Sequence, residues 1–168
     1  NIVASTDLYG GTVNLFKNTL RQQGIEVRFA DPADPKNFEK LTDDNTRAYY
    51  GESCPNPYLR VFPIKEVADI GKKKGIPLII DNTASPVICK PLTHGAAIVC
   101  HSLTKYIGGH GTSIGGIIVD GGNFDWTKDR KRQPLMNEPD QSYGGAIWAD
   151  AVPQLTGANI PFAIRARV

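Results

Sequence analysis

The stretch that decides the fold is 96-AAIVCHSLTKYIGGH-110. Its apolar start is typical of a buried strand of a parallel sheet, and this strand ends in hydroxyl residues, a lysine and a glycine pair. Ligands of open α/β sheets bind just beyond the carboxyl ends of such strands. Lys105, flanked by Ser102 and Thr104, therefore indicates an amine that is held near an anion. Taken alone, the stretch fits equally well a strand followed by a solvated loop with a surface lysine.

A second stretch, 76-IPLIIDNT-83, favours the ligand site. It is another short apolar run, and it ends in the carboxylate of Asp81. An acid and a lysine at neighbouring strand ends, with hydroxyl groups between them, match what pyridoxal phosphate (PLP) requires. The lysine forms the Schiff base, the carboxylate pairs with the pyridinium nitrogen, and hydroxyl groups hold the phosphate.

Length and composition place the chain among ordinary globular proteins. It has 168 residues, of which 40% are hydrophobic and 21% charged, and its formal net charge is +2. This charge is too small to indicate a nucleic-acid or membrane-surface partner, and no apolar run approaches the ~20 residues of a membrane span. The one dense basic run, residues 128–132, is interpreted as a solvated loop.

Cysteine and histidine usage argues against a metal site. Three cysteines and three histidines occur without metal-type spacing. The odd cysteine number favours reduced thiols and hence a cytoplasmic protein, and no signal peptide is visible. No metal is therefore expected.

Alternating strand-like and helix-like segments predict the architecture. An α/β fold with a mainly parallel sheet and flanking helices is the arrangement that this alternation indicates. Helices are expected over residues 12–23, 35–41 and from Pro63 to about residue 74. Strands are expected over residues 2–4, 25–29, 46–50, 78–80, 96–100 and 115–119.

The alternation of strand-like and helix-like segments does not continue beyond Asp120. Residues 121–168 carry four prolines and few periodic apolar positions, which predicts a long loop or a segment that needs partners. We therefore expect residues 1–120 to form the core of a cofactor-binding domain and residues 121–168 to connect to a further, C-terminal domain. The chain begins next to a strand without a methionine, so it is interpreted as a piece of a longer protein.

Four motifs in order resemble a known family. They are 7-DLYGGT-12, 52-ESCPNP-57, 81-DNT-83 and 102-SLTKYIGGHG-111. The chain resembles the cystathionine γ-synthase-like PLP enzymes of cysteine and methionine metabolism, which have the aspartate aminotransferase-like (fold type I) architecture. The continuation 115-GGIIVDGGNFDW-126 is similar to the O-acetylhomoserine sulfhydrylase branch. The stretches 52–55 and 83–86 differ from the sequences typical of that branch, which leaves the identity of the substrate open.

The resemblance implies the central catalytic roles. Lys105 would be the Schiff-base lysine and would then shuttle protons at the substrate's Cα and Cβ. Asp81 would keep the pyridinium nitrogen protonated, so that the ring accepts electrons from the carbanion. Tyr9 would stack on the pyridine face; its alternative is a turn aromatic that caps the core.

The remaining implied roles position the cofactor. Ser102 and Thr104 would donate hydrogen bonds to its phosphate. Asn56 would orient its 3-oxygen, although an Asn between two prolines also suits a turn. Thr83 would support the same ring, although threonines at strand ends often satisfy only backbone groups. Further phosphate-binding residues and a substrate-binding arginine are expected outside this chain.

The reaction implied by the resemblance is γ-replacement. O-acetyl-L-homoserine and a sulfur nucleophile would give L-homocysteine and acetate, a transferase step of methionine biosynthesis, in a homotetramer built from dimers. A γ-lyase, a cystathionine γ-synthase using cysteine, and a non-catalytic domain that keeps the fold are the alternatives.

Overall fold

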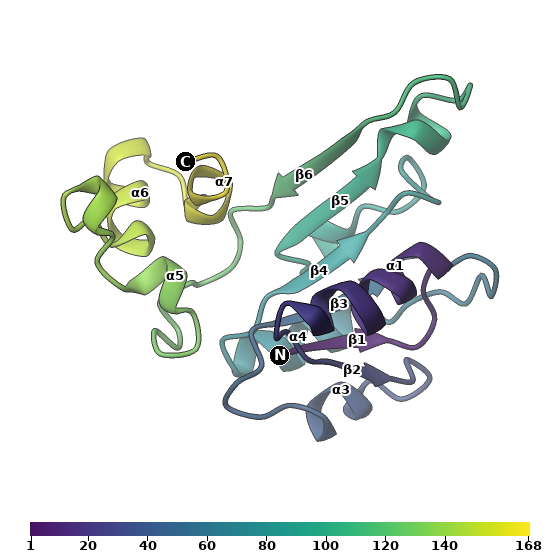
Figure 1. Cartoon of the computed structure of the whole chain (residues 1–168), viewed down its shortest axis with the longest axis horizontal. Coiled ribbons are helices and arrows are strands. Elements are labelled where there is room, and N and C mark those ends of the chain that lie inside the picture. The colour runs from purple at the N-terminus through teal and green to yellow at the C-terminus, as the bar shows by residue number, and fades with distance from the viewer.

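Six strands form one sheet in the order β2-β1-β3-β4-β5-β6 (Figure 1). The computed structural model describes all 168 residues. All neighbouring strands are parallel except β5 and β6, which form an antiparallel hairpin. The predicted mainly parallel α/β fold is therefore confirmed. The strands are β1 (Ile2–Ser5), β2 (Val27–Ala30), β3 (Ala48–Glu52), β4 (Leu78–Asp81), β5 (Ile98–Ser102) and β6 (Gly116–Asp120).

Helices follow the strands as the sequence predicts up to residue 120. The three expected helices are present, the first of them as a continuous run with a π-helical middle. They are α1–η1–α2 (Gly10–Asn14, Leu15–Thr19 and Leu20–Gln22), α3 (Lys36–Lys40) and α4 (Ile64–Lys73). Two short segments are η2 (Pro91–His94) and η3 (Leu103–Ile107). None of the helices combines the length and apolar character that crossing a lipid bilayer requires.

The sheet is covered on both faces, because its strands bury side chains alternately to each side. On one face, Val3, Tyr49 and Ile80 pack with α3 and α4 in the largest hydrophobic cluster. On the other face, Ala4 lies in the cluster beneath α1 and η1. Ile98, further along the sheet, packs under the C-terminal helices.

Close packing of α4 against the sheet depends on a glycine. The buried stripe of α4 contains Val67, Ala68 and Gly71. A Cβ atom at Gly71 would overlap the carbonyl oxygen of Ile76 and contact the ring of Tyr49. The helix therefore approaches the chain that leads into β4 more closely than any side chain at this position permits.

The structure corrects the expected long loop over residues 121–168. This segment forms four short helices: α5 (Pro134–Asn137), η4 (Gln141–Tyr143), α6 (Trp148–Thr156) and α7 (Pro161–Arg165). Pro134 and Pro161 occupy first-turn positions, where proline favours a helix rather than breaking it. Trp126 stacks on Phe162 with ring centroids 6.0 Å apart, so aromatic contacts rather than periodic apolar positions hold these helices.

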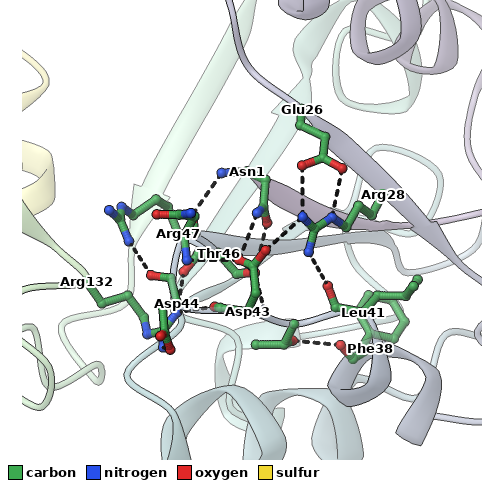
Figure 2. Close-up of polar contacts among 12 residues, drawn as sticks. Asn1, Glu26, Arg28, Phe38, Leu41, Asp43, Asp44, Thr46, Arg47 and Arg132 are labelled. Carbon is green, nitrogen blue, oxygen red and sulfur yellow. Dashed lines mark hydrogen bonds and ion pairs between the residues drawn. The ribbon is translucent and has the colours of Figure 1, made fainter.

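A polar network at the amino ends of the strands connects distant parts of the chain (Figure 2). The Asp43 carboxylate accepts a hydrogen bond from the Asn1 side chain and lies 2.7 Å from Arg28; these contacts lower the pKa of Asp43. Arg132 donates hydrogen bonds to the carbonyl oxygens of Asp43 and Thr46, at 2.7 and 2.9 Å. The basic run is thus not wholly a solvated loop, because the Arg132 side chain is only 10% exposed.

Candidate functional site

A cleft of about 570 Å³ opens at the carboxyl ends of β1, β3, β4 and β5. The chain order places β1 between β2 and β3, so the sheet reverses its winding here, and open α/β sheets bind ligands at such a point. Six of the seven predicted site residues line the cleft. The lining comprises Tyr9, Glu52, Cys54, Asn56, Pro57, Leu59, Asp81, Thr83, Ala84, Ser102, Lys105 and Tyr106.

Strand register brings the polar groups into one row. Glu52 and Asp81, the last residues of β3 and β4, and Cys100, in the middle of β5, are successive cross-strand partners. Partners in register point to the same face of a sheet, so these three side chains lie next to one another. Asp81 is fixed further, because its Oδ1 accepts a hydrogen bond of 2.8 Å from the Thr83 N–H.

Lys105 lies in η3, immediately after β5. Its backbone (φ −90°, ψ −117°) departs from helical geometry, so the helical path is interrupted at this residue. Its side chain lines the cleft together with that of Asp81, as the sequence predicts. Lys105 is exposed. η3 leads into the outward loop of the β5–β6 hairpin (Figure 1).

The two predicted threonines differ in placement. Thr83 lines the cleft, and its Oγ1 accepts a 2.8 Å hydrogen bond from the Ser102 N–H, which connects the ends of β4 and β5. Thr104 does not line the cleft. Its hydroxyl accepts a hydrogen bond from the Gly115 N–H and lies 3.4 Å from the Gly115 oxygen, so it closes the base of the hairpin.

Glu52 is the main cleft residue that sequence reasoning missed. It is 7% exposed, and its Oε1 accepts a hydrogen bond of 2.7 Å from the Tyr9 N–H. Burial, helped by the charge of Asp81, raises the pKa of Glu52 to about 7, although backbone N–H groups oppose the shift. The signal was its position at the end of β3, the strand between those that end at Ser5 and Asp81. Burial likewise raises the pKa of Cys100 to about 12, so this thiol stays protonated.

The donor set of the cleft fits PLP. It offers an amine (Lys105), a carboxylate (Asp81), a hydroxyl (Ser102) and aromatic rings (Tyr9 and Tyr106) around one space. A hollow of about 520 Å³ at the opposite end lacks this character, because its ten lining residues are all polar or charged. Aromatic cofactors require apolar contact as well as a few placed polar groups. Fold and cleft together define a PLP-binding α/β enzyme domain.

Comparison with known proteins gives the family. The family model of the Cys/Met metabolism PLP-dependent enzymes matches residues 1–158. The chain therefore belongs to this family, whose cofactor is PLP.

Individual relatives agree with this membership. An O-acetyl-L-homoserine sulfhydrylase of Leptospira meyeri is 49% identical over 99% of this chain, and O-acetyl-L-homoserine sulfhydrylase 1 of Thermus thermophilus is 46% identical over 100%. The chain spans 38% and 39% of the length of these two relatives. A solved O-acetylhomoserine (thiol)-lyase of Campylobacter jejuni, which carries a pyridoxyl-lysine monophosphate, covers 87% of this chain. It has a TM-score of 0.80 and 39% identity, and this chain covers 36% of it.

Proposed function

We propose that the protein catalyses γ-replacement on O-acetyl-L-homoserine with a sulfur nucleophile, which gives L-homocysteine and acetate. The observation that carries the proposal is the placement of Lys105 and Asp81 in one cleft at the ends of adjacent strands. The substrate class is supported by relatives that are named O-acetyl-L-homoserine sulfhydrylase and are 46–49% identical to this chain.

Each cleft residue then has a defined task. PLP, when bound, supplies the electron sink that acidifies the substrate's carbon–hydrogen bonds. Lys105 holds the cofactor covalently and afterwards moves protons at Cα and Cβ of the substrate. Asp81 holds a proton on the ring nitrogen, and Tyr9 covers one ring face. Asn56 orients the 3-oxygen of the cofactor.

The remaining groups position the cofactor. Ser102 donates a hydrogen bond to the phosphate. Thr104 reaches this phosphate only if its hydroxyl leaves Gly115, to which it is hydrogen-bonded here. Thr83 supports the ring while it keeps the ends of β4 and β5 connected.

The wider organisation is part of the proposal. Residues 1–120 would form the cofactor-binding core, and residues 121–168 would lead toward a C-terminal domain. The partners are an amino-acid substrate and a sulfur donor, in a homotetramer. A cytoplasmic location is supported by three cysteines that all have free thiols.

The decisive experiment uses the full-length protein and the Lys105→Ala variant. Wild-type protein with PLP should absorb near the violet edge of the visible spectrum, and borohydride should remove this band. The variant should lack the band and lose activity, because no other amine lines the cleft. Lys73→Ala, which changes an exposed lysine of α4, should behave as the wild type does.

Product analysis separates this reaction from the alternatives. With O-acetylhomoserine and sulfide, γ-replacement gives homocysteine, whereas a γ-lyase gives 2-oxobutyrate. An unchanged band in the Lys105→Ala variant, or 2-oxobutyrate as the dominant product, would contradict the proposal.

A further inference from the structure

A buried carboxyl group that the proposed reaction does not use lies beside Asp81. Glu52 and Asp81 are cross-strand partners at the ends of β3 and β4, and both line the cleft. Neighbouring carboxylates disfavour each other's ionisation, and burial adds to this effect for Glu52, which is 7% exposed and more buried than Asp81. Asp81 is half-buried, and its Oδ1 accepts a hydrogen bond of 2.8 Å from the Thr83 N–H.

Glu52 also connects two parts of the cleft wall. Its Oε1 accepts the N–H of Tyr9 at 2.7 Å, across 43 residues of sequence. Tyr9 precedes α1 directly, and no side chain caps the start of that helix. Tyr9 is 53% exposed, and the Glu52 contact ties its N–H to the end of β3, while its carbonyl accepts the Val13 N–H at the start of α1.

We propose that Glu52 is a positioning residue of the cofactor site, which anchors the Tyr9 backbone and holds a proton beside Asp81. This inference rests on the proposed function, since it assigns the pair to one cofactor ring. Glu52 acts through Tyr9 and Asp81 and is not itself a reacting group.

The surroundings of Glu52 favour the protonated form. Asp81 faces it from β4, Cys100 lies beyond Asp81 on β5, and the partly buried Tyr50 lies two residues before it on β3. Both Tyr50 and Cys100 are neutral at physiological pH, because burial raises the pKa of each. The cation across the cleft, Lys105, is exposed to solvent and so stabilises the Glu52 charge only weakly.

The proton on Glu52 makes stability depend on pH with a defined sign. Folding raises the pKa of Glu52 from 4.5 to about 7, so the folded protein binds this proton more tightly than the unfolded chain. The resulting stabilisation is complete below the unfolded value and is lost as the pH rises through about 7. A glutamine keeps the oxygen that accepts the Tyr9 N–H but has no proton to lose.

The test compares Glu52→Gln, Glu52→Ala and the control Glu66→Ala, which changes an exposed residue of α4. The full-length protein is used, with PLP and after its removal. In the PLP-free form, the fall in Tm between pH 5.5 and pH 8 should be about 5 °C smaller for Glu52→Gln than for the wild type. With PLP bound, the positive ring nitrogen offsets the second negative charge, so the difference should shrink.

The anchoring role is read by amide hydrogen exchange over residues 7–12. Exchange should accelerate about tenfold in Glu52→Ala and stay near the wild-type rate in Glu52→Gln, because only the alanine variant removes the acceptor. Glu66→Ala should change neither measurement. A Glu52→Gln pH profile parallel to that of the wild type, or unchanged exchange in Glu52→Ala, would overturn the inference. Failure of wild-type protein to bind PLP would instead overturn the proposed function.

Discussion

Asp81 reaches the cleft through strand geometry and one backbone contact. It is the last residue of β4, and its Oδ1 accepts the Thr83 N–H at 2.8 Å. This contact fixes one carboxylate oxygen and leaves the other free for the cofactor ring nitrogen in the role that we propose for Asp81. The side chain is therefore held in place before any ligand arrives, which lowers the entropic cost of binding.

Replacing Asp81 by Asn should separate its charge from its structural contact. The amide oxygen still accepts the Thr83 N–H, so folding should be unaffected, but the partner of a positive ring nitrogen is lost. We expect kcat to fall about 100-fold, because removing one member of a buried charge pair costs roughly 2–5 kcal/mol. Steady-state kinetics of homocysteine formation measure this loss.

The control for this substitution is Asp69→Asn, at an exposed ion pair with Lys65 on α4. It should leave kcat unchanged. If Asp81→Asn retained wild-type kcat, the assignment of Asp81 to the cofactor would be wrong.

Residues at strand ends could be predicted, because a short apolar run followed by a polar group marks the carboxyl edge of a parallel sheet. Lys105, Asp81 and Ser102 were found in this way. The contact that draws Thr104 toward Gly115 depends on the path of the hairpin, which spacing does not encode. Glu52 was missed because its burial results from the approach of Tyr9, 43 residues away.

At the scale of elements, α4 shows how packing outweighs propensity. Gly71→Ala would normally stabilise a helix by about 1 kcal/mol. Here the new methyl group would overlap the backbone carbonyl oxygen of Ile76. Relieving this overlap requires the chain that leads into β4 to move. We expect a net destabilisation of about 2 kcal/mol, because overpacking of a buried contact typically costs 1–3 kcal/mol. Urea unfolding measures this value.

A matched control is Gly10→Ala, in the first turn of α1. A Cβ at Gly10 meets no atom within 4 Å. This variant should be neutral or slightly stabilised, by up to about 1 kcal/mol. Equal stability of the two variants would show that the close approach at Gly71 does not contribute to the free energy of unfolding.

Helices held by periodic apolar stripes were predicted well, whereas those held by aromatic contacts were not. The α4 helix shows its buried stripe directly in the sequence. By contrast, α5 and α7 each begin with a proline and span only four and five residues, too few for periodicity to be recognised. Their stability comes from Phe124, Trp126 and Trp148, whose packing together is a tertiary property.

At the scale of the whole molecule, Arg132 joins the C-terminal segment to the loop that precedes β3. Arg132→Met keeps most of the aliphatic volume but removes the donors to the carbonyl oxygens of Asp43 and Thr46. We expect a loss of about 2–4 kcal/mol in the free energy of unfolding, because both carbonyl oxygens lose the Arg132 donor and that of Asp43 keeps only the Thr46 N–H. Chemical denaturation measures it, and PLP binding at the opposite strand ends should not change.

Arg130→Met provides the comparison, two residues away. Arg130 forms an exposed ion pair with Asp150, and such pairs contribute about 0–1 kcal/mol. A loss at Arg130 as large as that at Arg132 would contradict the special role of the buried carbonyl contacts.

The order of the cleft residues along the chain determines which part of the cleft is synthesised first. Along the chain, the cleft receives Tyr9 first, then Glu52 and Asp81, and Lys105 last, from the strand at the far end of the parallel run. A nascent polypeptide emerging from the ribosome thus exposes the acidic half of the cleft well before the amine exists. In the proposed role of Lys105, covalent capture of the vitamin B6 derivative requires β5 in place, so the trapped chromophore would report that the parallel strands β1 to β5 have assembled.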